Sequence, residues 1–291
     1  FIYDKNNRNA VSGFIGDKGK RGFIFRIIDA YGRYNTSDPL DGKTYFQGFP
    51  VWPTIHWEDW KPIAGENAWI AMQSAQLYHA KYFNPQTKSY LAPKDSLELA
   101  LAEEIARAAI LLQADNGGIR MAPIGTYHPQ GNDFYYYEIS TENNLSWYSA
   151  FRMLSQTSSS KYNQPMAEIE RYFKSVWDPV NNVFYQGAHY TNGQWVPNRS
   201  DFAVDCQTWA IDVLGPQKID SWFGEGAAYR MWQKTKELSG YYQGNKLLGV
   251  GYTTEHDQLS VEWTSGAIFG TNSLATYYQN THPDWVKECA A

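Results

Sequence analysis

Five carboxylates in this chain stand at the predicted starts of helices rich in tryptophan, alanine or tyrosine. They are Asp4, Glu66, Glu142, Asp205 and Glu262. Tryptophans follow closely in the same helices, at Trp69, Trp209 and Trp263. A carboxylic acid can donate a proton to a leaving group and a carboxylate can accept one, while aromatic rings present flat amphipathic surfaces. Acids beside rings therefore predict chemistry on a carbohydrate, provided that the acids converge in one cleft.

The predicted substrate contacts are the rings and the histidine that stand near these acids in sequence. Some belong to the helices that the acids begin, and others belong to aromatic loops. The predicted set is Trp57, Trp60, Trp69, Tyr136, Trp147, Trp209, His256 and Trp263. Each acid also has a structural explanation, since Asp and Glu are favoured in the first turn of a helix. Only their convergence in space separates catalysis from capping.

The elements that must position these groups are helices, which apolar periodicity predicts along the chain in pairs. The helices begun by the acids are apolar or small nearly all round, as buried helices are. Their successors have one apolar stripe, as in Ser96 to Gln113, and face water on the other side. The predicted pairs are 2–14 with 20–31, 66–82 with 95–113, 142–156 with 163–177, 203–214 with 217–238, and 258–279 with 283–290.

Longer aromatic segments connect each outer helix to the next inner one. They run from Asp41 to Trp60, from Asn116 to Ile139 and from Val183 to Val196. The last has strand-like runs on both sides of Asn192-Gly193, a typical β-hairpin turn. Since all these loops enter helices that carry an acid, they are predicted to form one binding face.

Buried inner helices with acids and Trp at their N-terminal ends resemble the (α/α) toroid of the six-hairpin glycosidase superfamily. The motifs concerned are Gly65-Glu66-Asn67-Ala68-Trp69, Thr141-Glu142-Asn143-Asn144, Asp205 with Trp209, and Glu262-Trp263. The resemblance covers nearly the whole chain and implies one all-α domain over 1–291, with β-hairpin-like aromatic loops on one face. This sequence shows five hairpins where the superfamily has six, so the ring is open or incomplete.

The resemblance also implies a reaction, the hydrolysis of a glycosidic bond in an oligo- or polysaccharide. In a six-fold arrangement Glu66 faces Glu262 across the cavity, and Asp4 faces Asp205. We expect Glu66 to act as general acid and Glu262 as base, with Glu142 and Asp205 as reserves. Carboxylates on opposite walls suit the inverting mechanism, in which the two groups are roughly 6.5–9.5 Å apart.

Composition limits the class of protein and its partners. The 291 residues are 43% hydrophobic and 19% charged, which is typical of a folded chain. A net charge of −5 without a Lys/Arg run argues against a nucleic-acid ligand. The longest apolar stretch, near Ile105 to Leu112, is too short for the ~20 residues of a membrane span. The chain begins at Phe1 rather than Met, which suggests a processed or trimmed chain. The compartment therefore stays open, with a secreted or periplasmic protein slightly favoured over a cytoplasmic one.

Metals and cofactors are not expected. The six histidines are scattered without metal-ligand spacing, and Walker A and dinucleotide-binding patterns are absent from the sequence. Cys206 and Cys289 are too few for a disulfide scaffold, although the two could pair with each other. The oligomeric state stays open.

Two other functions fit the same residues. A polysaccharide lyase or sugar epimerase on the same fold would use His or Tyr for proton transfer, such as His128, Tyr135 to Tyr137 or His256. Alternatively, the acids only cap helices, and the aromatic loops form a docking surface of a scaffold that binds a carbohydrate or a protein without turnover.

Overall fold

The computed structural model describes residues 62–91, 96–124, 126, 128, 130–131, 133–254 and 256–290. It also describes Phe23 and the backbone of two short strands, β1 (Tyr45–Phe46) and β2 (Phe49–Pro50), which pair with each other. The predicted hairpin of 2–14 with 20–31 lies outside these residues, and so do Asp4, Trp57 and Trp60.

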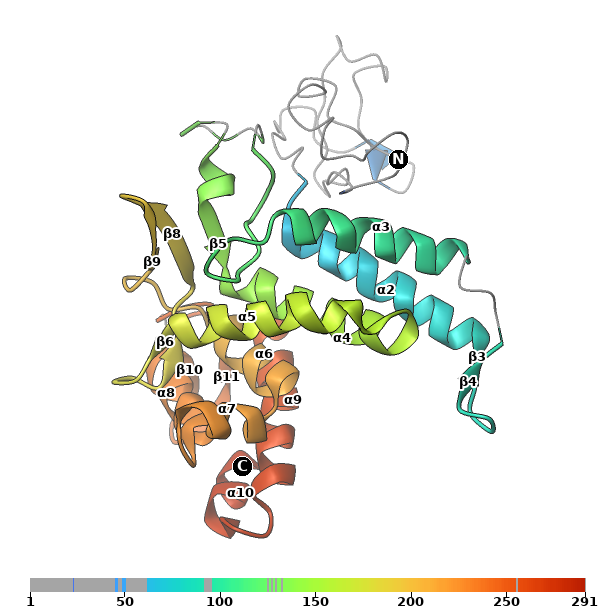
Figure 1. Ribbon diagram of the computed structural model, residues 1–291. Helices are drawn as coiled ribbons and strands as arrows, with labels where there is room; N and C mark the ends of the chain where they lie inside the picture. Colours follow the sequence, from blue (N-terminus) through green and yellow to red (C-terminus); the bar gives the residue numbers. More distant parts are fainter. Residues whose placement is uncertain are drawn as a thin grey trace.

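Helical hairpins follow one another along the described chain, as Figure 1 shows. Inner helices with an acid in the first turn alternate with outer helices. Three of the predicted hairpins are confirmed to within a few residues at each end, and the inner helix of a fourth, 203–214, is confirmed as well. The inner helices are α2 (Ala64–Tyr82), α4 (Thr141–Thr157), α6 (Val204–Leu214) and α9 (Val261–Tyr278). The outer helices are α3 (Leu97–Leu111), α5 (Asn163–Ser175), α7 (Pro216–Phe223), α8 (Ala227–Ser239) and α10 (Pro283–Cys289).

The inner helices pack against one another in sequence order, α2 on α4, α4 on α6 and α6 on α9. Each outer helix packs on the inner helix before it, as α3 does on α2 and α10 on α9. Over the part of the chain that the structure describes, the hairpins form an arc and not a closed barrel (Figure 1). The N-terminal ends of the four inner helices meet at one pocket.

One predicted outer helix, 217–238, is wrong as a single element. Helix α7 ends at Phe223 and α8 begins at Ala227, because Gly224 and Gly226 adopt φ of 97° and 78°. Helical residues have negative φ, so the helix breaks there. The predicted stop of α6 at Gly215-Pro216 is confirmed, with φ of 83° at Gly215.

Short antiparallel strands fill the connections. The pairs are β3 (Phe83–Asn84) with β4 (Ser89–Tyr90), β6 (Trp177–Asp178) with β7 (Val183–Phe184), and β10 (Gly240–Gln243) with β11 (Lys246–Val250). The predicted hairpin at Asn192-Gly193 is confirmed as β8 (Gly187–Thr191) and β9 (Gln194–Pro197), with positive φ at both turn residues. A third strand, β5 (Glu138–Ser140), pairs with β8 and was not predicted.

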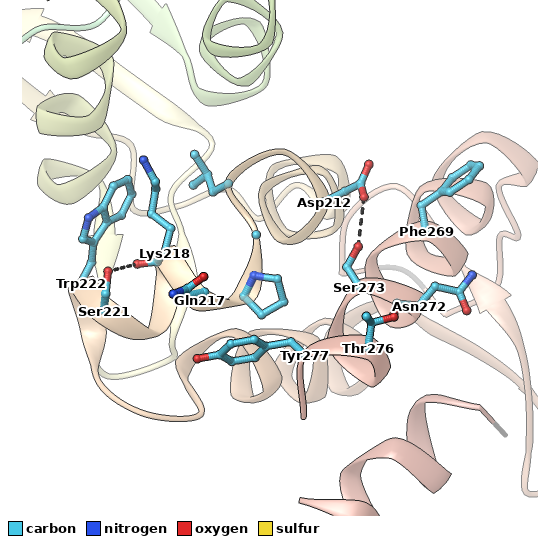
Figure 2. A pocket seen from close by; sticks show the side chains of 13 residues that line it. Asp212, Gln217, Lys218, Ser221, Trp222, Phe269, Asn272, Ser273, Thr276 and Tyr277 are labelled. Carbon is cyan, nitrogen blue, oxygen red and sulfur yellow. Dashed lines mark hydrogen bonds between the residues drawn. The ribbon is translucent and has the colours of Figure 1, made fainter. Parts of the chain in front are cut away.

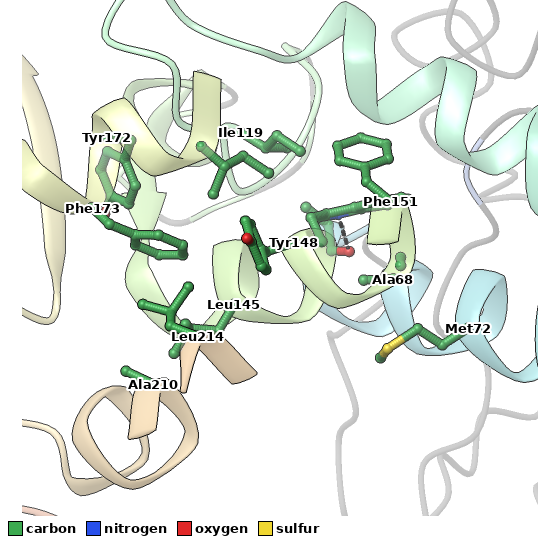
Figure 3. Close-up of a cluster of buried hydrophobic side chains, with 14 of the residues drawn as sticks. Ala68, Met72, Ile119, Leu145, Tyr148, Phe151, Tyr172, Phe173, Ala210 and Leu214 are labelled. Atoms are coloured by element: carbon green, nitrogen blue, oxygen red, sulfur yellow. Dashed lines mark hydrogen bonds between the residues drawn. The ribbon is translucent and has the colours of Figure 1, made fainter. Parts of the chain in front are cut away.

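Helix α4 lies at the centre of the core, between α2, α5 and α6. Its side chains Leu145, Tyr148 and Phe151 are buried (Figure 3). Tyr172 and Phe173 of α5 are completely buried on the same side. Because α4 contributes to the core on several faces, it fixes the positions of α2 and α6, the two inner helices beside it.

A polar side chain two residues after an acid ties each of three inner helices to the loop that precedes it. Asn144 accepts a hydrogen bond from the Ile119 N–H (2.7 Å) and donates one to the Ile119 carbonyl (3.0 Å). Gln207 does the same with Phe184 (2.8 and 2.9 Å). Thr264 accepts from the Val250 N–H (3.0 Å) and donates to its carbonyl (3.4 Å). This repeated clamp sets where each acid stands.

Breaking one clamp is expected to destabilise the protein. The Gln207 side chain is fully buried and also donates to the Ala203 carbonyl (3.0 Å). Gln207→Leu keeps the volume but leaves the Phe184 N–H and carbonyl without their side-chain partner, which costs about 1–3 kcal/mol for each group that water cannot reach. We expect a loss of roughly 3 kcal/mol in the free energy of unfolding, measured by urea denaturation. The exposed Gln243→Leu is the control, and equal effects in both variants would contradict the clamp.

Candidate active site

Four of the five predicted acids line one pocket of about 600 Å³ at the N-terminal ends of the inner helices. Glu66 comes from α2, Glu142 from α4, Asp205 from α6 and Glu262 from α9, each within the first turn. This volume lies within the range of roughly 300–1,000 Å³ that small-molecule sites occupy. The structure therefore brings together acids that are up to 196 residues apart in sequence.

Aromatic rings share the walls of this acid pocket. Trp69, Trp209 and Trp263 all line it, and their rings form a row. The Trp69 and Trp209 centroids are 6.0 Å apart in an edge-to-face contact, and those of Trp209 and Trp263 are 6.4 Å apart. Trp69 is 47% exposed, so its ring is open to a ligand.

Three of the predicted substrate contacts lie elsewhere. Trp147 is 0% exposed, and its indole N–H donates to the Ala64 carbonyl (2.8 Å), so it is a core residue and the predicted ligand contact is corrected. Tyr136 packs against the core, with the Arg120 guanidinium 4.1 Å from its ring centroid. His256 is on the surface, where its ring nitrogen Nδ1 is 3.0 Å from the Gly240 carbonyl oxygen.

Sequence reasoning missed several residues of the acid pocket. Gln186 reaches it from the loop before β8, whereas Tyr135, which the sequence predicts only as a proton-transfer group of a lyase or epimerase, lines it in place of Tyr136. Ser140 and Asn143 also line it. The Ser140 hydroxyl accepts from the Asn143 N–H (3.2 Å) as the N-cap of α4. The Ser-x-x-Asn capping pattern that spans Glu142 is the sequence signal that could have identified Ser140 and Asn143, because a capping residue stands beside the start of its helix.

The pKa of Glu142 is raised to about 7, mainly by burial. The negative charges of Asp205 and Glu262 also contribute to this rise, while the Ser146 hydroxyl, 3.4 Å from Oε1, opposes it. Burial also raises the pKa of Asp205, with a smaller contribution from Glu262 and an opposing one from hydrogen bonds at Cys206. A carboxyl group poised near neutral pH can hold and release a proton.

Cys206 follows Asp205 and lines the acid pocket as a thiol. Complete burial raises its pKa well above the ordinary value, so it is protonated and unsuited to nucleophilic attack. Both cysteines are free, so the Cys206–Cys289 disulfide that the sequence left open is not formed in this structure. Within the described ranges no cluster of His, Cys, Asp or Glu is arranged to hold a metal ion. None of the described helices is long and apolar enough to cross a membrane.

Gly266, four residues after Glu262, allows the Trp209 ring to lie against α9. A Cβ at this position would be 2.8 Å from the Trp209 Nε1 atom and 3.0 Å from Cδ1. Alanine is favoured over glycine in a helix by up to about 1 kcal/mol, but overpacking costs about 1–3 kcal/mol. The ring must therefore move.

We expect Gly266→Ala to weaken ligand binding in the acid pocket by roughly tenfold while changing stability by less than about 2 kcal/mol. Isothermal titration with an oligosaccharide, the ligand class that the sequence predicts, and thermal unfolding together measure the two effects. Ser265→Ala, on the exposed side of the same helix, is the control. Unchanged affinity in Gly266→Ala would show that the position of the Trp209 ring does not matter for binding.

Comparisons with known proteins identify the fold. No protein-family profile and no curated protein matches this sequence. Among solved structures, a sugar epimerase from a ruminal bacterium matches 87% of this chain and 63% of its own, with 15% identity and a TM-score of 0.54. An alpha-1,6-mannanase from Salegentibacter sp. HEL1_6 matches 78% of this chain and 61% of its own, with 14% identity and a TM-score of 0.48.

An unsaturated glucuronyl hydrolase from Streptococcus agalactiae matches 77% of this chain and 55% of its own, with 13% identity and a TM-score of 0.49. The chain thus has the six-hairpin glycosidase-like (α/α) toroid fold, and that prediction is confirmed. No specific family within this fold is identified. The chain spans less than two thirds of the length of these structures.

Proposed function

We propose that this protein is a carbohydrate-active enzyme that hydrolyses glycosidic bonds in an oligo- or polysaccharide. One observation carries the proposal: four carboxylates from successive inner helices open into a tryptophan-lined pocket, where one of them has a pKa of about 7. Capping explains each acid singly, but it does not explain why the four acids share one pocket, where the charges of Glu142, Asp205 and Glu262 repel one another. Solved structures of similar fold include enzymes named as hydrolases of sugars, at identities that support the fold only.

Glu142 is the general acid in this proposal, in place of Glu66. A general acid must hold a proton at working pH and release it to the leaving oxygen, and Glu142 has the pKa for that. Glu262 remains the proposed base, since it is exposed at the mouth of the acid pocket, where water can reach it. Asp205 stands between them and helps to keep Glu142 protonated through its charge. The inverting mechanism stays a prediction.

The test is an acid-to-amide series, Glu66→Gln, Glu142→Gln, Asp205→Asn and Glu262→Gln, assayed for reducing ends released from a library of neutral and acidic glycans. We expect Glu142→Gln and Glu262→Gln to be nearly inactive on a glycan that the parent cleaves. Full activity in both would end this assignment. A parent that binds glycans without cleaving any would favour the non-catalytic scaffold.

A second candidate, sugar epimerase, is supported by Tyr135, because a phenol in the acid pocket could transfer a proton at a sugar carbon. The solved structure with a TM-score of 0.54 is also named a sugar epimerase. Epimerisation yields a stereoisomer without new reducing ends, and a lyase yields an unsaturated product that absorbs ultraviolet light. Chromatography of the products separates all three reactions. Loss of stereoisomer formation in Tyr135→Phe would support the epimerase.

A further inference from the structure

A second cavity of about 270 Å³ lies next to the acid pocket, further along the inner helices. Trp69 and Trp209 line both spaces. The second cavity is lined by the residues four and seven positions after an acid, which lie on the same helix face as that acid. These are Ser146 and Ser149 on α4, Trp209 and Asp212 on α6, and Gly266 and Phe269 on α9.

A wide groove of about 960 Å³ between α6, α7 and α9 adjoins the second cavity. Asp212 and Phe269 line both spaces. Figure 2 shows the groove, with Trp222 and Lys218 on one side and Phe269 and Asn272 on the other. The Ser273 hydroxyl donates to Asp212 (3.2 Å) and so ties α9 to α6 along its wall.

These three spaces follow one another along α9 and are together called the track. Its residues at the mouth, the middle and the groove are Glu262, Phe269 and Thr276. They are spaced by seven positions, two helical turns each, so the track extends about 21 Å at 1.5 Å per residue. A single sugar fills only the acid pocket, whereas a chain of sugars could occupy the whole length.

The lining of the track matches a neutral sugar chain. Flat rings recur along it, at Trp69, Trp209, Phe269, Trp222 and Tyr277, and Phe269 is 63% exposed. Hydroxyl and amide groups stand between the rings, as at Ser149 and Asn272. Among the described residues that line these spaces, Lys218 is the one with a positively charged side chain, and it already pairs with Glu170 and Tyr148. The described walls therefore offer an anionic ligand no uncommitted positive charge.

We propose that the substrate is a linear, uncharged polysaccharide whose chain runs from the acid pocket, past Trp69 and Trp209, into the groove beside Trp222. This inference rests on the proposed function and deepens it, because it assigns binding subsites beyond the reacting bond. It predicts that activity rises with chain length until the groove is filled.

The test uses linear mannan, glucan and galactan oligosaccharides from two to six units long. Trp222→Ala removes a ring of the groove, and Asn272→Trp fills the groove from an exposed position that does not affect the core. Tyr242→Ala, an exposed ring away from the track, is the matched control. For both groove variants we expect kcat/KM to fall about tenfold on the longest chains and least on the disaccharide.

Affinity measured in the Glu142→Gln background separates this inference from the proposed function. If the parent cleaves glycans but kcat/KM of both groove variants falls equally at every chain length, or does not fall, the proposal of the track is overturned and the proposal of hydrolysis stands. If no glycan is cleaved but long chains bind with an affinity that falls in Trp222→Ala, hydrolysis is overturned and the track stands. Absence of both cleavage and binding overturns both.

Discussion

Replacing Glu142 by Gln is expected to lower kcat for glycan hydrolysis by roughly 10²–10⁴-fold, the usual contribution of general acid catalysis. The amide keeps the shape of the side chain but has no proton to donate. The parent should lose activity as pH rises through about 7, because Glu142 then ionises. This alkaline decline should be absent from the residual activity of Glu142→Gln. Initial rates measured across the pH range check both expectations.

The same variant is expected to be more stable than the parent at alkaline pH. Between pH 4.5, the ordinary pKa, and about 7, the folded protein holds a proton on Glu142 that the unfolded chain has released. Stability therefore falls as pH rises through this window, and the full cost is present above it. At 1.36 kcal/mol per pKa unit the cost is on the order of 3 kcal/mol.

Urea denaturation at about pH 8 and about pH 4.5 measures this effect. Because the carboxyl group proposed as the acid also destabilises the fold, we expect stability and activity to oppose each other. Glu142→Gln should be more stable than the parent by about 2–3 kcal/mol at the higher pH and equal to it at the lower. Glu104→Gln, on the outer helix α3, is the control. A Glu142→Gln protein that is less stable at both values would contradict the raised pKa and with it the choice of general acid.

The starts of the inner helices could be predicted because local chemistry marks them. A serine caps α4 and α9, with its hydroxyl accepting from the N–H three residues on, and an acid follows in the first turn. The three-stranded sheet could not be predicted from such signals. Its register pairs Glu138 with His189, 51 residues apart, and only the packed fold brings them together. The break at Gly224–Gly226 was readable, since two glycines within three residues disfavour a helix.

The candidate site divides in the same way. Around the helix axis, a residue four positions after an acid lies about 40° from that acid, whereas a residue five positions after it lies about 140° away. Trp209 stands four after Asp205 and lines the acid pocket, whereas Trp147 stands five after Glu142 and points into the core. Counting from each acid would thus have separated ligand rings from core rings. The clamp residues Asn144 and Gln207 needed the structure, because their backbone partners are 25 and 23 residues away.

Trp147→Ala is expected to cost about 3–5 kcal/mol in the free energy of unfolding, the usual range for emptying a buried ring site. The Trp147 ring is completely enclosed, stacks on Phe23 at 6.1 Å and contacts Phe151 at 5.2 Å. Its loss also leaves the Ala64 carbonyl without its indole donor, at the residue that begins α2.

Trp69→Ala is the matched comparison, because it removes the same side chain from a position that is 47% exposed. We expect it to lose less than about 1.5 kcal/mol of stability but to weaken oligosaccharide binding about tenfold. Trp147→Ala should bind the same oligosaccharide nearly as well as the parent at a temperature where it remains folded. Calorimetric unfolding gives the stability of each variant, and calorimetric titration gives its affinity for the oligosaccharide. A stable Trp147→Ala protein that no longer binds the oligosaccharide would restore Trp147 as a ligand contact.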